Sequence, residues 1–196
     1  MTIPEGYTYS SDARVVASDI GWRDITAQVT TRGVGATDPA WTQIGSGPFY
    51  AYSFALNDVA WFTYHIPHDI VRDAPIHLHA HWMSDGTNAN SVKWEWYYTF
   101  AQGFDQENFD STGTLIEAEE AISESPITAY RHMVTETAAI TIPGLDEPDG
   151  LLQVRIRRVT NGATDNTDEI FLLESDVHYL SNSLATPYKS PNFYDR

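Results

Sequence analysis

The stretch that decides the fold is Ile76-His-Leu-His-Ala-His-Trp82. Successive side chains of a β-strand point to opposite faces, so His77, His79 and His81 are expected to share one face. The other face is expected to hold the apolar residues of the stretch, which are Ile76, Leu78, Ala80 and Trp82. The alternation predicts a strand that packs its apolar side on a core and presents a row of imidazoles on its other side.

Alternating apolar and polar residues recur along the chain after about residue 40. They predict further strands near residues 49–56, 61–66, 92–100, 134–142, 151–159 and 170–180. Turn-forming residues separate these stretches, and about eight short strands with turns between them are typical of a sandwich or jelly roll. The sequence therefore predicts an all-β protein with a jelly-roll-like β-sandwich.

Turn chemistry also suggests how two of these strands pair. The segment 85–90, Asp-Gly-Thr-Asn-Ala-Asn, separates the strands expected at 75–82 and 91–100. We predict that these two strands form an antiparallel hairpin with a longer loop. The second strand is rich in aromatic residues, and its alternation places Trp94 and Trp96 on the core side.

One segment has features of a helix. Within residues 114–124, Thr114 and Glu117 have the spacing of a capping box. A sparse apolar stripe accompanies them, formed by Leu115, Ala118 and Ile122. The sequence therefore predicts at most one short helix.

The chain has 196 residues, which suits one domain with an arm and is long enough for a substantial core. Residues 1–37 are weakly patterned and contain several Gly, Ser and Thr, so we expect an extended N-terminal arm there. We expect residues 38–196 to form the β-sandwich domain, ending in an irregular C-terminal tail.

Composition excludes several classes of function. The chain has 27 acidic and 11 basic residues, a formal net charge of −16, and would repel a phosphate backbone, so we expect no nucleic-acid partner. It has no cysteine, which excludes a disulfide framework, a thiolate zinc site and a cysteine nucleophile. We expect no membrane partner, since the sequence shows neither a signal-peptide pattern nor an apolar run long enough to span a bilayer.

Familiar catalytic motifs are also missing. The sequence contains no phosphate-binding loop, no dinucleotide-binding glycine pattern, no zinc-protease motif and no nucleophile elbow. We therefore expect that the protein is not an enzyme and uses no cofactor, and we assign no catalytic, cofactor-binding or metal-ligating residue.

The histidine row leaves several interpretations open: a metal site, a polar network or a contact between subunits. His79 and His81 could supply two ligands to zinc or iron, and Asp85 follows them at a spacing similar to that of the cupin metal motif. His132 or His178 could be a third ligand. The second histidine motif of cupins has no counterpart here, so a cupin-like metal-dependent enzyme using His79 and His81 stands as the alternative from another functional class.

Basic residues are scarce, yet one predicted strand contains three of them, Arg155, Arg157 and Arg158. Arg155 and Arg157 are two residues apart in a predicted strand and share a face. A guanidinium group pairs well with carboxylates, and this chain has many of them. We therefore expect these arginines to form ion pairs within or between subunits.

Taken in order, several short motifs resemble those of a group of tailed-bacteriophage structural proteins. The motifs are Trp41-Thr-Gln-Ile44, Ile66-Pro-His-Asp69, His77-Leu-His-Ala-His-Trp82, Lys93-Trp-Glu-Trp-Tyr-Tyr98, Arg155-Ile-Arg-Arg158, Glu174-Ser-Asp-Val-His-Tyr179 and Pro191-Asn-Phe-Tyr194. The resemblance covers roughly residues 40 to 196.

This resemblance implies a component of the virion, made in the bacterial host cytoplasm, that forms a β-sandwich and assembles as a homotrimer. The expected role is that of a capsid decoration or cement protein on the head surface, with the major capsid protein or other virion proteins as partners. A tail or head-fibre appendage is the alternative. The resemblance implies no catalytic residues, and it does not say whether His77, His79 and His81 meet at a subunit interface.

Overall fold

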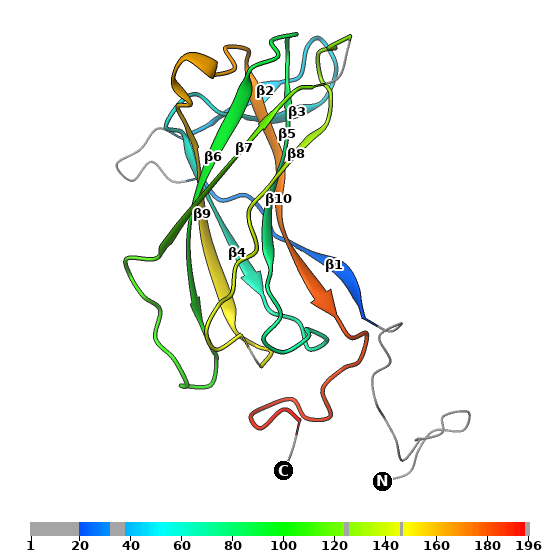
Figure 1. Ribbon diagram of the computed structural model, residues 1–196, viewed down its shortest axis with the longest axis vertical. Coiled ribbons are helices and arrows are strands. Elements are labelled where there is room, and N and C mark those ends of the chain that lie inside the picture. Colours follow the sequence, from blue (N-terminus) through cyan, green and yellow to red (C-terminus); the bar gives the residue numbers. More distant parts are fainter. Residues whose placement is uncertain (1–19, 32–37, 124–125, 146, 195–196) are drawn as a thin grey trace, which may run out of the picture.

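The chain folds into two antiparallel β-sheets that pack face to face (Figure 1). The computed structural model describes residues 20–31, 38–123, 126–145 and 147–194. Within them, the helical structure consists of one 3-10 turn, Gly162–Thr164 (η2). The predicted all-β sandwich is confirmed. No helix among the described residues is long and apolar enough to cross a membrane.

The first sheet has six strands, and β10 is at its centre. In spatial order they are β2 (Ala40–Gln43), β3 (Tyr50–Ser53), β10 (Ile170–Ser181), β5 (His77–Ser84) and β8 (Met133–Glu136), with β1 (Gly21–Thr26) also paired to β10. Strand β3 pairs with residues 171–172 of β10, whereas β1 pairs with residues 176–181. Strand β5 follows the other edge of β10 for nearly its whole length.

The second sheet has four strands. Their order is β4 (Val59–His65), β9 (Leu151–Val159), β6 (Ser91–Ala101) and β7 (Thr114–Ala121). Strand β9 has the bounds that its sequence pattern predicts. In Figure 1, β6 and β9 lie to the left of β5 and β10, and β7 crosses the view obliquely.

Aromatic side chains fill the space between the sheets. Trp82 of β5 and Trp94 and Trp96 of β6 are fully buried, as their alternation predicts. The indole Nε1 of Trp82 donates a hydrogen bond to Thr135 Oγ1 at 2.9 Å. Burial of such large apolar surfaces is the main stabilising contribution to a sandwich of this size.

The predicted hairpin between β5 and β6 is wrong, because these strands belong to different sheets. Both strands have an apolar face, and placing them in opposite sheets lets both faces contribute to one core. The connecting loop is held by Asn166, whose Nδ2 donates to the carbonyl oxygens of Asn88 and Asn90. The segment 85–90 is therefore a crossing between the sheets.

The predicted helix over 114–124 is also wrong, since residues 114–121 form β7 and residues 124–125 lie outside the described part of the chain. Ile116 and Ala118 face inward and pack against the core, while Leu115 and Glu117 are exposed. This is the period of two that a strand requires. Eight residue pairs with β6 fix the register, so tertiary pairing overrides the capping-box signal.

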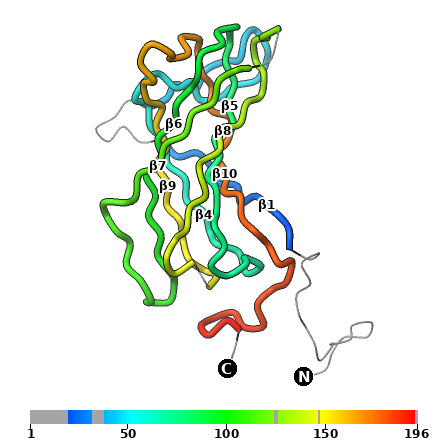
Figure 2. Tube along the Cα trace, in the orientation of Figure 1, coloured from blue at the N-terminus to red at the C-terminus, as the bar shows by residue number. Residues whose placement is uncertain are grey.

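Part of the predicted arm belongs to the first sheet. Strand β1 lies beside the C-terminal half of β10, where Figure 2 shows the blue and orange tubes running together. Arg23 on β1 pairs with Asp69 at 2.8 Å, and Asp69 also accepts hydrogen bonds from Tyr179 and Ser181 on β10. Residues 1–19 and 32–37 of the predicted arm lie outside the described residues.

Candidate functional site

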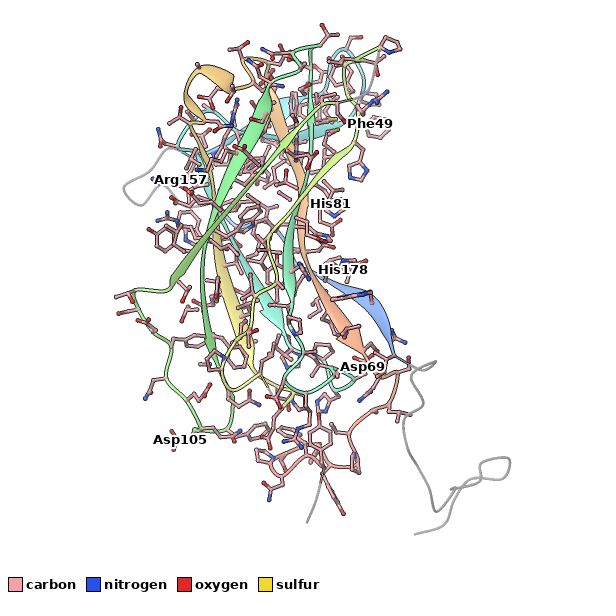
Figure 3. All side chains as sticks on the ribbon, in the orientation of Figure 1. Phe49, Asp69, His81, Asp105, Arg157 and His178 are labelled. Atoms are coloured by element: carbon pink, nitrogen blue, oxygen red, sulfur yellow. The ribbon has the colours of Figure 1, made fainter. Side chains whose placement is uncertain are left out.

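The row of histidines on β5 lies on the outer face of the first sheet, as the alternation predicts. The strand register places Asp176 opposite His79 from one side and Glu136 opposite His79 from the other. We call this surface the histidine face, formed by His77, His79, His81, His132, Glu136, Asp176 and His178. In Figure 3, His81 and His178 project from the same side of the sandwich.

His79 lies at the centre of this face and is nearly buried. Its Nε2 lies 2.7 Å from Glu136 Oε2, and its Nδ1 lies 3.3 Å from Asp176 Oδ1. Burial lowers the pKa of the imidazole, but the two carboxylates raise it more, and the net shift is upward from the ordinary value of 6.5. His79 thus has a carboxylate oxygen at each ring nitrogen.

Asp176 connects His79 to His81. Its Oδ1 is also 3.3 Å from His81 Nε2, while His81 Nδ1 lies 2.8 Å from Nε2 of His132. Asp176 is 4% exposed. Burial raises the pKa of its carboxyl, but the imidazoles outweigh burial and hold that pKa well below its ordinary value. The carboxylate is therefore ionised in a nearly dry position between two imidazoles.

The other end of the histidine face is covered by Trp22 of β1. The Trp22 ring lies 5.5 Å from the His77 ring and 5.3 Å from the His178 ring, measured between centroids. His178 Nε2 lies 3.3 Å from Asp24 Oδ1, and His77 Nδ1 lies 3.0 Å from the Thr137 carbonyl oxygen. His77 and His178 therefore contact the Trp22 ring and each has a separate oxygen atom as a polar partner.

The carboxylate that sequence spacing suggested is not the one at this site. Asp85 lies at the end of β5, where its Oδ1 accepts a hydrogen bond from the backbone N–H of Glu169. Four residues of strand place it about 13 Å from His81. The cupin-like set of His79, His81 and Asp85 is thus not brought together. Asp176 takes the place expected of Asp85.

The remaining histidines, His65 and His68, lie at a corner at one end of the sandwich. Both Nε2 atoms approach Asp149 Oδ1, at 3.0 Å from His65 and 3.1 Å from His68. His68 Nδ1 also lies 2.5 Å from Thr186 Oγ1. The pair fastens the chain near Pro67 to the loop before β9.

Arg155 and Arg157 of β9 form ion pairs within the chain. Arg155 Nη2 lies 2.8 Å from Glu95 Oε1, and Arg157 Nη2 lies 2.7 Å from Glu95 Oε2. This confirms that they share a face and form ion pairs, and it makes the nearly buried Glu95 a bridge between them. Arg157 projects from the side of the sandwich opposite His81 (Figure 3).

A groove of about 890 Å³ lies over the second sheet near these arginines. Trp61, Tyr97 and Arg155 line it, and the Arg155 guanidinium lies 4.5 Å from the centroid of the Tyr97 ring. The loop 110–113 and the polar residue Gln153 also contribute to its lining. The groove therefore combines aromatic faces with hydrogen-bonding groups.

Comparison with known proteins gives weak structural likenesses. A xylan-binding module, CBM15, matches with a TM-score of 0.36 and 11% identity over 82% of this chain and 95% of that one. A cycloisomaltooligosaccharide glucanotransferase of Paenibacillus sp. matches with a TM-score of 0.32 and 12% identity, over 85% of this chain and 19% of that one. The enzymatically active domain of tailspike protein 4 of bacteriophage CBA120 matches with a TM-score of 0.27 and 9% identity, over 86% of this chain and 20% of that one. No family model and no curated protein matches the sequence.

Proposed function

We propose that this chain is a non-enzymatic structural protein of a tailed-phage particle, which associates with copies of itself as a trimer on the head surface. The resemblance of its ordered motifs over roughly residues 40 to 196 supports the phage assignment. The proposed partners are a second and third copy of the chain and the major capsid protein, and the proposed location is the virion.

Self-association is supported by the exposed aromatic side chains of the β2–β3 hairpin. Trp41, Phe49 and Tyr50 are 62%, 73% and 48% exposed, which is unusual for aromatic side chains in one short hairpin. The rings of Trp41 and Tyr50 stack with centroids 6.3 Å apart. Phe49 projects into solvent near the upper end of the molecule, on the same side of the view as His81 (Figure 3).

Charge explains why copies would meet at this hairpin. Residues 39–57 contain no Asp, Glu, Lys or Arg, although the whole chain has a net charge of −16. Two copies repel one another wherever acidic surfaces face each other, and this repulsion is smallest across an uncharged segment. Aromatic residues at such a contact would also supply most of its binding free energy.

The mass of the protein in solution tests this proposal. We expect a trimer by light scattering coupled to gel filtration, and a shift toward monomer for the double variant Trp41→Ser, Phe49→Ser. Leu115→Ser is the matched control, because Leu115 is an exposed apolar residue on β7 of the other sheet. A wild-type protein that stays monomeric at high concentration would contradict the proposal.

Quantitative mass spectrometry of purified particles separates the two positions on the virion. A copy number comparable with that of the capsid protein is expected for decoration of the head. A copy number of a few per particle would favour a tail or head-fibre appendage. Absence of the chain from particles would refute both.

The groove over the second sheet favours one further function, which is binding of a carbohydrate. Trp61 offers an aromatic face for a sugar ring, and Gln153 and Arg155 offer hydrogen bonds to hydroxyl groups. A glycan array followed by calorimetry tests it. Trp61→Ala should abolish any binding, whereas Trp22→Ala, on the opposite sheet, should not. A blank array would remove this function without affecting the first.

A further inference from the structure

We propose that His79, His81 and Asp176 form a binding site for a divalent transition-metal ion of the zinc class. The ligand atoms are His79 Nδ1, His81 Nε2 and Asp176 Oδ1. This site is independent of the proposed assembly and of the groove over the second sheet, which lies on the other face of the sandwich.

The distances from Asp176 Oδ1 to the two imidazole nitrogens match the spacing of ligands around one small ion. Asp176 Oδ1 lies 3.3 Å from His79 Nδ1 and 3.3 Å from His81 Nε2. Zinc binds nitrogen and oxygen at about 2.0–2.2 Å, and neighbouring ligands of a tetrahedral ion are then about 3.3–3.6 Å apart. One ligand atom from each of the three residues also lies within 4.8 Å of the other two.

The lack of a hydrogen bond to the buried Oδ1 of Asp176 is a separate observation that indicates a bound ligand. Its Oδ1 is buried and receives no hydrogen bond, although two imidazole nitrogens lie 3.3 Å away. The imidazoles stabilise the charge of this carboxylate, but its buried oxygen still lacks an aligned hydrogen-bond donor, which is unfavourable in a dry position. A metal ion bound by this oxygen and the two ring nitrogens would remove that cost.

The second ring nitrogen of each proposed histidine ligand has a polar partner, as is usual for histidines that bind a metal. Such a histidine normally uses its second ring nitrogen to donate a hydrogen bond, which fixes the tautomer and the ring orientation. His79 has Glu136 Oε2 at 2.7 Å from its second nitrogen. The second ring nitrogen of His81, Nδ1, lies 2.8 Å from His132 Nε2. Both rings are thus held with the proposed ligand nitrogen toward Asp176.

The donor set selects the class of ion. Two imidazole nitrogens and one carboxylate oxygen suit zinc and its first-row neighbours, whereas calcium and magnesium prefer oxygen ligands throughout. A second cluster, Asp24, His79 and His178, shares His79, but the Asp24 side chain is 53% exposed and the Asp176 side chain is 6% exposed. We therefore place the ion at Asp176.

Calorimetry with Zn²⁺ alone, on protein freed of metal by a chelator and dialysed, tests the site. We expect one ion per chain, and a loss of affinity of at least about 100-fold in both variants, since Asp176→Asn replaces a charged ligand by a neutral amide and His81→Ala removes one of three ligands. Co²⁺ should give the visible absorption bands of a tetrahedral complex in the wild type, and these bands should be absent from both variants. Mg²⁺ and Ca²⁺ should give no heat.

The control is the double variant His65→Ala, His68→Ala, which removes the histidine pair at Asp149 and leaves the site intact. It should bind Zn²⁺ like the wild type. Asp176→Asn keeps the shape of the side chain, and circular dichroism checks that each variant is folded. Wild-type protein that binds no Zn²⁺, or His81→Ala binding that equals wild type, would overturn the proposal. Loss of binding in the His65, His68 variant alone would place the ion at Asp149 and overturn it equally.

Discussion

Glu136 Oε2 lies 2.7 Å from His79 Nε2, the ring nitrogen that faces away from Asp176. This contact joins the edge strand β8 to β5 by side chains, next to the backbone pairing of the same two residues. It lowers the pKa of the Glu136 carboxyl and fixes the orientation of the His79 ring. Glu136 therefore positions a ligand of the proposed metal site without belonging to the ligand set.

Removing Glu136 should weaken zinc binding without abolishing it. We expect Glu136→Ala to lower the affinity about 10–100-fold, the range found for residues that orient a metal-bound histidine. Glu136→Gln should lower it less, because the amide oxygen still accepts a hydrogen bond. Calorimetry measures both. Glu117→Gln removes an equal charge from the other sheet and should bind like wild type; a similar loss in that variant would indicate a long-range charge effect instead.

The stability of the metal-free protein should depend on pH in two directions. The pKa of His79 is raised from 6.5, so its contribution to stability is complete below that value and is lost as pH rises through the folded-state pKa. The pKa of Asp176 is lowered from 3.8, so its contribution is present above that value and is lost as pH falls. The midpoint of urea unfolding should therefore be highest between these two values. The charged and titratable groups that surround His79 are Asp24, His77, His81, Glu136, Asp176 and His178.

Bound zinc should offset the loss of stability that the metal-free protein shows as pH rises. Metal ions compete with protons for imidazole nitrogen, so the stabilisation by zinc should grow as pH rises from 5 to 8. The measurement is thermal unfolding at several pH values with and without excess Zn²⁺. An equal effect of zinc at every pH would argue against histidine ligands.

Glu95 should contribute far more to stability than its neighbour in the register, Glu117. Glu95 is nearly buried between Arg155 and Arg157, and its removal leaves two partly buried guanidinium groups without their carboxylate. We expect Glu95→Ala to lower the free energy of unfolding by about 2–3 kcal/mol. Glu117 pairs with Lys93 at the surface, and Glu117→Ala should cost less than about 1 kcal/mol. Urea unfolding compares the two, and equal losses would contradict the bridging role of Glu95.

Two core tryptophans should respond differently to replacement by phenylalanine. Trp82 Nε1 donates to Thr135 Oγ1, whereas Trp96 Nε1 is buried without a hydrogen-bond partner. Both changes remove the same atoms, but only Trp82→Phe also removes a hydrogen bond. Trp82→Phe should therefore destabilise the protein by about 1 kcal/mol more than Trp96→Phe. Chemical unfolding measures the difference, and an equal or reversed order would show that packing alone decides the cost.

Alternation in the sequence was enough to predict the sandwich, the faces of β5 and β6 and the bounds of β9. The alternation did not identify β7, because both a helical period and the period of a strand fit the apolar residues of this segment. Leu115, Ala118 and Ile122 follow a helical period, while Ile116, Ala118 and Ile122 follow the period of a strand with Glu120 between them. An edge strand buries only one face and has few apolar residues, so its pattern is weak.

The candidate metal site could be predicted only in part. His79 and His81 are two residues apart, and their shared face follows from strand geometry alone. Asp176 and Glu136 lie far from them in sequence and reach the site through the pairing of β10 and β8 with β5. Nothing in a single sequence specifies that register, and the local spacing favoured Asp85 instead. Asp176 lies within the motif Glu174-Ser-Asp-Val-His-Tyr179, whose local pattern gives no sign of a metal ligand.

The pairing of β1 with β10 has a consequence for synthesis. Gly21 pairs with Ser181, so β1 leaves the ribosome long before the strand with which it pairs. Contacts between such distant segments slow folding, because a long loop must close before they form. Until β1 docks, the Trp22 ring covers neither His77 nor His178. The N-terminal strand is therefore expected to dock last, over a face that the other strands have already assembled.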